Sequence, residues 1–339
     1  MKRLLVNDCL TAIPGTRTFW HDLMEWFDME FVGGSFDTLR RMTDGAGYPN
    51  NQVSIIIRNA SYFGPLEHPA STISLLQDIF TEGPQRKMQE EVIKSSQAVV
   101  FNSNFTSSKY PQFPPDLKEL RKYHIIPLPV DFDLFQPGNP MGLQQALSLP
   151  DGCVCWVGAS QGAAGHVKGY DIFLSIVRQN PDIPFVGIFK DSAPEYGPPN
   201  LRMFTRLTHE ELVKVIGACR VGLCTSRMES QHLAGIEMGA CGLAMVAPPV
   251  GVYWNRDKFP ITLVPSSEIY NSGIRVALAN PGDPQEIRSC WQKEFSKPVI
   301  RKAWENLIRE IERVGPGANS PTVPDRDSAA GLGGTSGVP

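Results

Sequence analysis

The sequence has little excess charge of either sign. Its 32 Lys and Arg residues are nearly balanced by 35 Asp and Glu residues, and the formal net charge is −3 at pH 7. Nucleic-acid-binding domains usually carry a clear basic excess. The composition therefore excludes a protein that binds nucleic acid through a strongly basic overall charge.

Long apolar runs and cysteine clusters are also missing. No run approaches the roughly 18 apolar residues that a membrane-spanning helix needs. The start of the chain, Met1 to Asp8, contains only a brief apolar run, which predicts a strand rather than a signal peptide. Seven cysteines are scattered without the spacing of a zinc site. We therefore expect reduced thiols, no metal site and a cytoplasmic location.

Apolar segments of strand length alternate with amphipathic segments, which predicts an α/β fold with parallel sheets. The 339 residues are 42% hydrophobic and 20% charged, enough for two globular domains. The expected strands cover residues 2–6, 52–58, 72–77, 98–101, 153–157, 185–189, 201–204, 219–225 and 261–264, with one more ending at residue 247. The expected helices cover residues 18–27, 83–96, 210–219 and 285–314, the third with a capping box of Thr208 and Glu211. A long loop is expected at 158–169, with a further helix starting at Lys168.

A proline-rich segment from His124 to Pro137 divides the chain. Its prolines would stiffen a crossing between two domains. We expect a first Rossmann-like domain at 1–128, a linker at 129–150, a second Rossmann-like domain at 151–290 and further helices at 291–314. Residues 315–339 are rich in Gly, Pro, Ser and Asp without periodicity, and predict a disordered tail.

Two carboxylates seven residues apart stand out in the second half. Glu229 lies in the loop after an expected strand, and Glu237 lies on the helix that follows. In open parallel sheets, ligands bind beyond the carboxyl ends of the strands, where helix N-termini present free N–H groups. A phosphate fits such a place, and the two carboxylates would hold sugar hydroxyls beside it.

This Glu-x7-Glu pattern resembles the retaining glycosyltransferases of GT-B architecture, in glycosyltransferase family four. The linker sequence Val130-Asp-Phe-Asp-Leu-Phe-Gln-Pro137 and the pair Lys168-Gly169 resemble the same family. The similarity extends over about residues 1–310 and is sharper after residue 120. It implies two Rossmann-like domains that face a cleft, a nucleoside diphosphate sugar as donor, and no cofactor. It also implies that the last helices return to the first domain.

The resemblance assigns a role to each matching residue. It implies that Lys168 holds the donor diphosphate, that Glu229 lies at the donor sugar, and that Glu237 grips the ribose. The nucleotide base would pack near residues 204–207. Backbone groups and loop residues complete the implied donor site: Gly158, Ser230, Gln231, His232 and Leu233.

The sequence departs from the family at two positions. Family members usually carry an arginine after the glycine that matches Gly158, where this chain has Ala159 and Ser160. Arg206 or Arg227 would have to replace that cation. Many members also have a histidine where this chain has Gln77, and His68 lies too early to match it.

The first domain offers weaker candidates on the acceptor side. Their positions at strand or loop ends also suit plain turn and cap residues. These candidates are Gly15, Thr16, Asp78, Asn102 and Ser103. Similarly, Asp131 and Asp133 have the spacing of a metal-binding Asp-x-Asp pair, but they lie in the linker, and we interpret them as structural.

The sequence therefore predicts a retaining, metal-independent glycosyltransferase that moves a sugar to an acceptor hydroxyl. Attack on the same face as the leaving diphosphate would retain the configuration. The acceptor stays open between a glycan, a lipid-linked sugar, a small molecule and a modified nucleobase. Two alternatives remain: a nucleotide-sugar epimerase of the same architecture, and a GT-B-like binding protein that is weak or inactive in catalysis.

Overall fold

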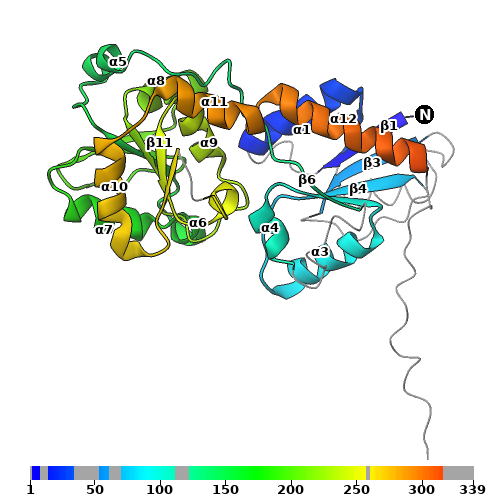
Figure 1. The fold of residues 1–339 in the computed structure, drawn as a ribbon. Coiled ribbons are helices and arrows are strands. Elements are labelled where there is room, and N and C mark those ends of the chain that lie inside the picture. Colours follow the sequence, from blue (N-terminus) through cyan, green and yellow to red (C-terminus); the bar gives the residue numbers. More distant parts are fainter. Residues whose placement is uncertain are drawn as a thin grey trace, which may run out of the picture.

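A computed structural model describes residues 2–7, 14–33, 53–60, 70–110, 122–256 and 260–315. Two six-stranded sheets, each flanked by helices, form two halves joined near residues 126–153 (Figure 1). All strand pairs are parallel, so the predicted α/β class is confirmed. His68 and the predicted tail beyond Gly315 lie outside the described residues.

The first sheet has the strand order β2-β1-β3-β4-β5-β6. Strands β3 and β4 are buried along almost their whole length, as expected for a parallel sheet covered on both faces. Strand β2 was not expected from the sequence. The strands are β1 (Lys2–Asn7), β2 (Glu30–Gly33), β3 (Val53–Asn59), β4 (Ser71–Leu76), β5 (Ala98–Phe101) and β6 (Tyr123–Ile125).

The second sheet has the strand order β12-β11-β10-β7-β8-β9. Read from the other edge, this is the order of a dinucleotide-binding Rossmann sheet, which reverses between its first and fourth strands. The reversal here lies between β7 and β10. The strands are β7 (Val154–Gly158), β8 (Phe185–Phe189), β9 (Leu201–Thr205), β10 (Val221–Leu223), β11 (Ala244–Ala247) and β12 (Ile261–Leu263).

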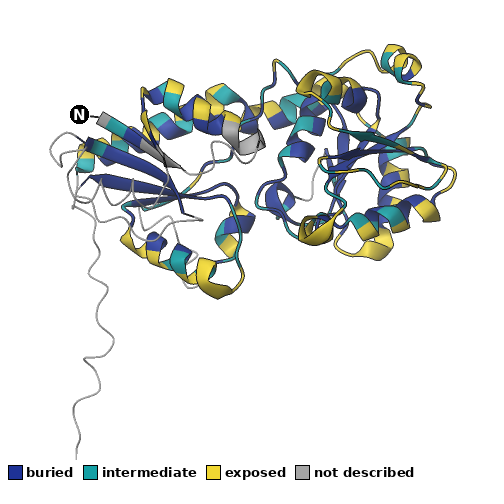
Figure 2. Cartoon of the chain, turned by 180° about the vertical axis from the view of Figure 1, so that it is seen from behind, coloured by how far each residue is buried: buried dark blue, intermediate teal, exposed yellow. Residues whose placement is uncertain are grey.

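Helices cover both faces of each sheet, and their outer sides are exposed while inner strands such as β3, β4, β7 and β8 are buried (Figure 2). In the described part of the chain, no helix is long and apolar enough to cross a membrane. The α-helices are α1 (Pro14–Phe27), α3 (Gly83–Ser95), α4 (Asn104–Ser108), α5 (Pro140–Leu147), α6 (Gly162–Lys168), α7 (Tyr170–Gln179), α8 (His209–Gly217), α9 (Leu233–Ala240), α10 (Tyr270–Ala279), α11 (Pro284–Phe295) and α12 (Lys297–Val314). Short 3-10 turns are η2 (Gly251–Tyr253) and η3 (Ser267–Ile269).

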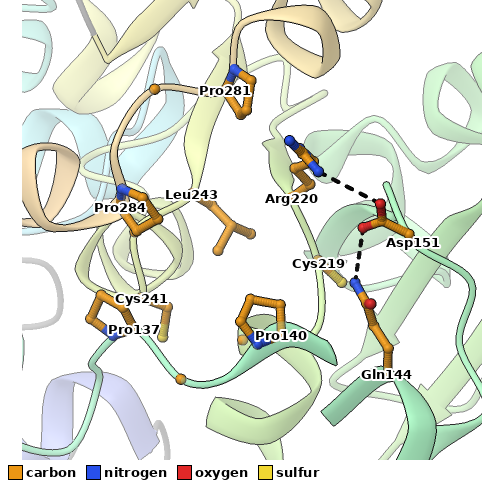
Figure 3. A pocket seen from close by; sticks show the side chains of 14 residues that line it. Pro137, Pro140, Gln144, Asp151, Cys219, Arg220, Cys241, Leu243, Pro281 and Pro284 are labelled. Atoms are coloured by element: carbon orange, nitrogen blue, oxygen red, sulfur yellow. Dashed lines mark hydrogen bonds and ion pairs between the residues drawn. The ribbon is translucent and has the colours of Figure 1, made fainter. Parts of the chain in front are cut away.

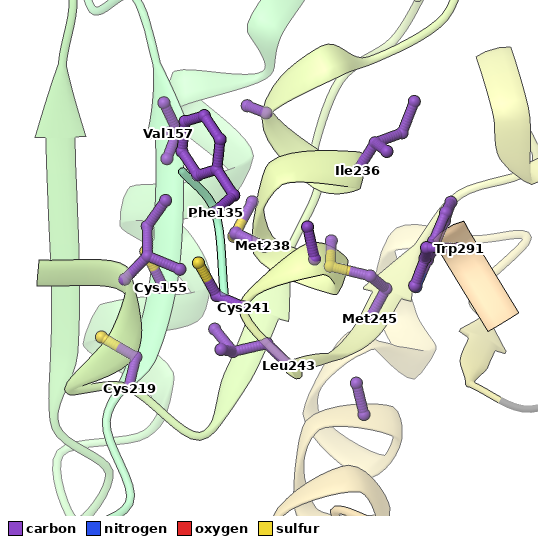
Figure 4. Close-up of a cluster of buried hydrophobic side chains, with 14 of the residues drawn as sticks. Phe135, Cys155, Val157, Cys219, Ile236, Met238, Cys241, Leu243, Met245 and Trp291 are labelled. Carbon is purple, nitrogen blue, oxygen red and sulfur yellow. The ribbon is translucent and has the colours of Figure 1, made fainter. Parts of the chain in front are cut away.

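The main core of the second half lies between its sheet, α9 and α11 (Figure 4). Small and sulfur-containing side chains fill it, including Cys155, Cys219, Met238 and Cys241. The six described cysteines are free thiols, and burial raises the pKa of Cys224 and Cys241 to about 12. These thiols therefore pack as small apolar groups rather than as reactive ones.

The last helix belongs to the core of the first half. Trp304 on α12 is fully buried, and its ring centroid lies 6.2 Å from that of Phe19 on α1. At the start of α12, the Lys297 ammonium lies 3.3 Å from the Asp22 carboxylate and 3.4 Å from that of Asp131. Helix α12 therefore runs along α1 and covers the first sheet (Figure 1).

Two local predictions were wrong. Residues 158–169 are not one long loop, because α6 forms within them. Helix α1 begins at Pro14, which suits the first turn of a helix, so Gly15 and Thr16 lie in that turn and not in a loop. The predicted linker contains α5, which the Asn139 side chain caps at its start. The predicted Thr208–Glu211 capping box of α8 is confirmed.

Candidate functional site

The candidate site lies where the strand order of the second sheet reverses. Chain segments that follow neighbouring strands β7 and β10 meet there, at the carboxyl edge of the sheet. The first segment begins at Ala159, and the second runs from Cys224 to His232 and leads into α9. A reversal point leaves a crevice between diverging connections, which is where open α/β sheets bind ligands.

Lys168 and Glu229 form an ion pair at this edge, with Nζ and Oε1 2.5 Å apart. The Ser226 hydroxyl donates to the same oxygen at 2.7 Å. Burial raises the pKa of the Glu229 carboxyl. The Lys168 charge, the two hydrogen bonds and, at acid pH where its ring is protonated, His232 outweigh burial, so the pKa lies below its ordinary value. Glu229 is therefore an ionised carboxylate in a mostly buried setting.

Thr225 fixes the backbone of Lys168. Its hydroxyl donates to the carbonyl oxygens of Lys168 and Gly169 at 3.0 Å, and accepts from the Trp156 ring N–H at 2.9 Å. Gly169 has φ +65°, and a Cβ there would lie 1.9 Å from the Thr225 carbonyl oxygen. Only glycine allows this close approach.

The structure corrects the sequence-based placement of Lys168. The residue ends α6 and does not start a helix, with Gly169 as the cap between α6 and α7. A cation is favoured at the C-terminal end of a helix dipole. The position of Lys168 therefore does not by itself require an anionic ligand. The assignment of Lys168 to the candidate site rests instead on its ion pair with Glu229.

His232 is buried behind Glu229 and has φ +73°, at the N-cap of α9. Its Nδ1 lies 2.7 Å from the Tyr253 hydroxyl. Burial lowers the pKa of His232 to about 4, so the ring is neutral near pH 7. Burial also keeps Tyr253 protonated by raising its pKa, so the hydroxyl can donate to Nδ1 and leave the ring proton on Nε2. Tyr253 was not predicted, since no local motif marks it.

Glu237 differs from Glu229 in having no fixed partner. Its half-buried carboxylate makes no hydrogen bond or ion pair with any described residue. Burial raises the pKa of this carboxyl, although Lys190 and His209 act in the opposite direction. A half-buried carboxylate without hydrogen bonds is unfavourable by itself. The Glu237 carboxylate is therefore available to accept hydrogen bonds from a ligand.

The loop between the two glutamates touches the first half of the molecule. The Gln231 side chain donates to the Leu128 carbonyl oxygen at 2.8 Å and accepts from the Leu128 N–H at 2.7 Å. The Ser230 carbonyl accepts from the Ser103 hydroxyl, and from the Thr106 hydroxyl at 3.1 Å. The side chains of Gln231 and Ser103 are therefore used between the two halves, and the N-terminus of α9 is left without a side-chain cap.

Two other first-half side chains lie side by side at the carboxyl edge of their sheet. Strands β4 and β5 pair in register at Leu76 and Phe101, so Gln77 and Asn102 follow them as neighbours. Both are buried, and Gln77 Nε2 and Asn102 Nδ2 have no hydrogen-bond partner among the residues that the structure describes. Asn102 Oδ1 accepts from the Thr106 hydroxyl at 2.8 Å, which links it to the Ser230 contact.

Asp78 follows Gln77, and its carbonyl oxygen accepts from the side chain of Gln89 at 3.2 Å. Gly15 and Thr16 share the first turn of α1, and the structure describes only their backbone. No interaction that the structure describes links these three residues to the segment 226–233.

The two arginines proposed to replace the missing family arginine differ. The two terminal guanidinium nitrogens of Arg227 donate to the Asp171 carboxylate, at 2.8 and 2.6 Å, and one of them also donates to the His166 carbonyl. Arg206 is exposed after β9 with φ +53°, and makes no hydrogen bond in the part of the chain that the structure describes. Arg227 is thus held in the α6–α7 region, while Arg206 is free to meet a ligand near Phe204 and Leu207.

The Asp131 side chain has a structural role, whereas Asp133 takes part only through its backbone N–H. The Asp131 carboxylate accepts from the N–H groups of Asp133 and Leu134, at 3.0 Å each, and pairs with Lys297. Among the residues with described positions, no group of three or more His, Cys, Asp or Glu side chains is arranged to hold a metal ion.

A pocket of about 290 Å³ lies at the opposite edge of the second sheet (Figure 3). Asp151, Arg220 and Leu243, which line it, all precede strands, so they lie at the amino edge. Asp151 binds Arg220 at 3.6 Å and Gln144 at 3.2 Å. Because its charged groups are already paired with each other, we do not assign the ligand site to this pocket.

The chain is similar to a curated glycosyltransferase over part of its length. No family model matches the chain. D-inositol 3-phosphate glycosyltransferase of Segniliparus rotundus is 26% identical over 213 residues, which cover 55% of this chain and 46% of that protein. The chain therefore spans about half the length of this curated relative.

Three solved structures share the fold of nearly the whole chain. Sucrose-phosphate synthase from Thermosynechococcus elongatus has a TM-score of 0.73 at 14% identity, covering 93% of this chain and 100% of that one. Anabaena HepE in complex with UDP has a TM-score of 0.72 at 12% identity, covering 91% and 100%. A glycosyltransferase from Rickettsia africae has a TM-score of 0.70 at 12% identity, covering 91% of this chain and 98% of that one. The two-sheet α/β fold of this chain is thus the GT-B fold of glycosyltransferases.

Proposed function

We propose that the protein is a glycosyltransferase that moves a sugar from a nucleoside diphosphate sugar to an acceptor hydroxyl. One arrangement carries the proposal. At the reversal point of the second sheet, Lys168 pairs with Glu229 in the segment that leads to α9, a helix without a side-chain cap. That helix holds Glu237, whose carboxylate has no partner among the described residues. A cation, helix N–H groups and two carboxylates match a diphosphate flanked by sugar hydroxyls.

In this proposal, each part of the donor has a place. Glu237 accepts hydrogen bonds from the ribose hydroxyls, and the first-turn N–H groups of α9, from Leu233 on, bind the diphosphate. Glu229 accepts from hydroxyls of the transferred sugar. The base lies near Phe204 and Arg206, after β9. UDP sugars are the first donors to test, because HepE, of similar fold, binds UDP and UDP-glucose.

The reaction that we propose retains the anomeric configuration. The acceptor oxygen bonds to the anomeric carbon on the face that the diphosphate leaves, and the carbon–oxygen bond to the diphosphate breaks. The acceptor proton passes to the leaving phosphate oxygen. Lys168 and the α9 N-terminus stabilise the negative charge that grows on the diphosphate. We propose that these groups act without a metal ion.

The acceptor would approach from the first sheet. Gln77 and Asn102 each have a buried amide nitrogen without a partner in the described ranges, so they are the best candidates to donate to hydroxyls there. Either orientation of the Asn102 amide leaves one polar atom unpaired, because Thr106 engages only the other. Ser103 then acts as a positioning residue through Ser230, and Asp78, Gly15 and Thr16 remain weaker candidates.

A ligand panel tests the donor site. Thermal unfolding is measured with UDP, GDP, ADP and their glucose conjugates, for wild type, Glu237→Ala and Lys168→Ala. A ligand at 100 times its Kd raises the unfolding free energy by about 2.7 kcal/mol. We expect one base to stabilise the wild type selectively and both variants to lose that gain. No shift with any nucleotide would reject the proposal.

The finer claims have separate tests. Turnover of the selected nucleotide sugar in EDTA tests metal independence, and NMR of the product's anomeric proton tests retention. The relatives do not favour the epimerase or the inactive binding protein. Donor binding with no transfer to glycans, lipid-linked sugars or small hydroxylated acceptors would restore the binding-protein alternative. The free thiols fit the proposed cytoplasmic location.

A further inference from the structure

In the loop after β7, two N–H groups that could bind a phosphate are already used within the protein. The N–H groups of Ser160 and Gln161 both donate to the Asp191 carboxylate, at 3.0–3.1 Å. The Ser160 hydroxyl donates to Asp191 and to the Ser192 carbonyl. Asp191 thus occupies the N–H groups beside Ala159, and this loop also lacks the arginine that the resembling family carries there.

A lysine lies next to the same place on the neighbouring strand. Strands β7 and β8 pair with Gly158 opposite Phe189, and the Lys190 N–H donates to the Gly158 carbonyl at 3.0 Å. Lys190 therefore leaves β8 directly alongside the position where β7 continues into Ala159. The parallel register, and not proximity in sequence, brings a cation to the edge where the arginine is missing.

Lys190 is available for a ligand. Its side chain is exposed and forms no hydrogen bond or ion pair within the described ranges. By contrast, Lys168 is paired with Glu229, and Arg227 with Asp171. The charge of Lys190 also acts on His232 and Glu237, so it lies within electrostatic reach of the candidate site.

We propose that Lys190 is the second cation of the donor site and binds the diphosphate in place of the missing arginine. This inference rests on the proposed function. The Lys190 ammonium would contact a non-bridging diphosphate oxygen from the β8 side, opposite Lys168. A lysine is a point charge on a flexible stem, so it binds phosphate without the fixed fork of an arginine.

Calorimetric titration of UDP, GDP and ADP, each against its own nucleoside, tests the assignment. The variants are Lys190→Ala and Lys190→Arg, with Lys302→Ala as a control for loss of an exposed lysine on α12. We expect Lys190→Ala to weaken binding of the preferred diphosphate about 10-fold to about 100-fold, as for loss of one charge-assisted contact. Nucleoside binding should not change, and Lys190→Arg and Lys302→Ala should keep most of the affinity.

The outcomes separate the two proposals. Wild-type binding that Lys190→Ala leaves intact overturns the role of Lys190 and leaves the proposed function standing. Equal weakening of diphosphate and nucleoside also overturns it, because the effect would then not concern the phosphates. If the wild type binds none of the three diphosphates, the proposed function fails, and the role of Lys190 fails with it.

Discussion

The side-chain amide of Gln231 makes two hydrogen bonds to the backbone of Leu128, which lies 103 residues earlier in the chain. Gln231 is almost fully buried. Because Gln231 lies between Glu229 and His232, this pair fastens the segment that carries the candidate site to the end of the first sheet.

Replacing Gln231 tests the strength of that attachment. Gln231→Ala leaves the Leu128 N–H and carbonyl buried without partners, which costs about 1–3 kcal/mol for each stranded group. We expect a loss of about 2–4 kcal/mol in the free energy of unfolding, measured with urea. The control is Gln145→Ala on the exposed side of α5. A Gln231→Ala loss no larger than that of the control would contradict a structural role for this contact.

Glu237→Gln separates stability from ligand binding. The carboxylate has no partner among the residues with described positions, so an uncharged amide of the same shape is better tolerated where it lies. We expect the variant without ligand to unfold at the same or a higher temperature than the wild type near pH 7. Its affinity for a nucleoside diphosphate should fall, and the preference for ribose over deoxyribose should disappear. Unchanged discrimination against the 2′-deoxy nucleotide would argue against ribose recognition by Glu237.

The buried His232 predicts an acid-sensitive fold. Its pKa is about 4 in the folded protein and about 6.5 when unfolded, so the unfolded chain takes up a proton that the folded one does not. Its contribution to stability is complete above pH 6.5 and is lost as the pH falls toward 4. His232→Gln keeps a partner for Tyr253 and cannot titrate.

We therefore expect the stability difference between wild type and His232→Gln to shrink by about 1–3 kcal/mol between pH 7 and pH 4. Urea unfolding at several pH values measures it. His209→Gln, at the exposed start of α8, is the matched control and should parallel the wild type. Parallel curves for wild type and His232→Gln would show that His232 is not held neutral.

The sequence predicted the parallel strands, and it marked Glu229 and Glu237 as candidate site residues, because both depend on local patterns. Apolar runs mark buried strands, and the strand–helix–Gly–strand order marks the unit that carries both glutamates. It could not predict that Asp171 holds Arg227, or that Lys190 emerges beside Ala159. Those contacts depend on how α6 folds within an expected loop and on the register of β7 with β8, which no local pattern encodes.

The Lys168–Glu229 pair should behave as a unit. Lys168→Met leaves a buried carboxylate with only the Ser226 hydroxyl, and Glu229→Gln leaves an ammonium beside a neutral amide. Breaking a buried pair from one side costs about 3–5 kcal/mol, and less here because the Lys168 side chain is 26% exposed. The double variant carries no stranded charge, so we expect it to be more stable than the sum of the single losses predicts.

A double-mutant cycle in urea measures this coupling, with an expected value of about 1–2 kcal/mol. Transfer activity should be lost in all three variants, since each removes a group that would contact the donor. The pH adds a check: the pKa of Glu229 is lowered, so its stabilising effect is present above about pH 4.5 and is lost as the pH falls further. The Glu229→Gln variant should lack that acid-dependent loss, and additive single effects would show that the two side chains do not form a stabilising pair.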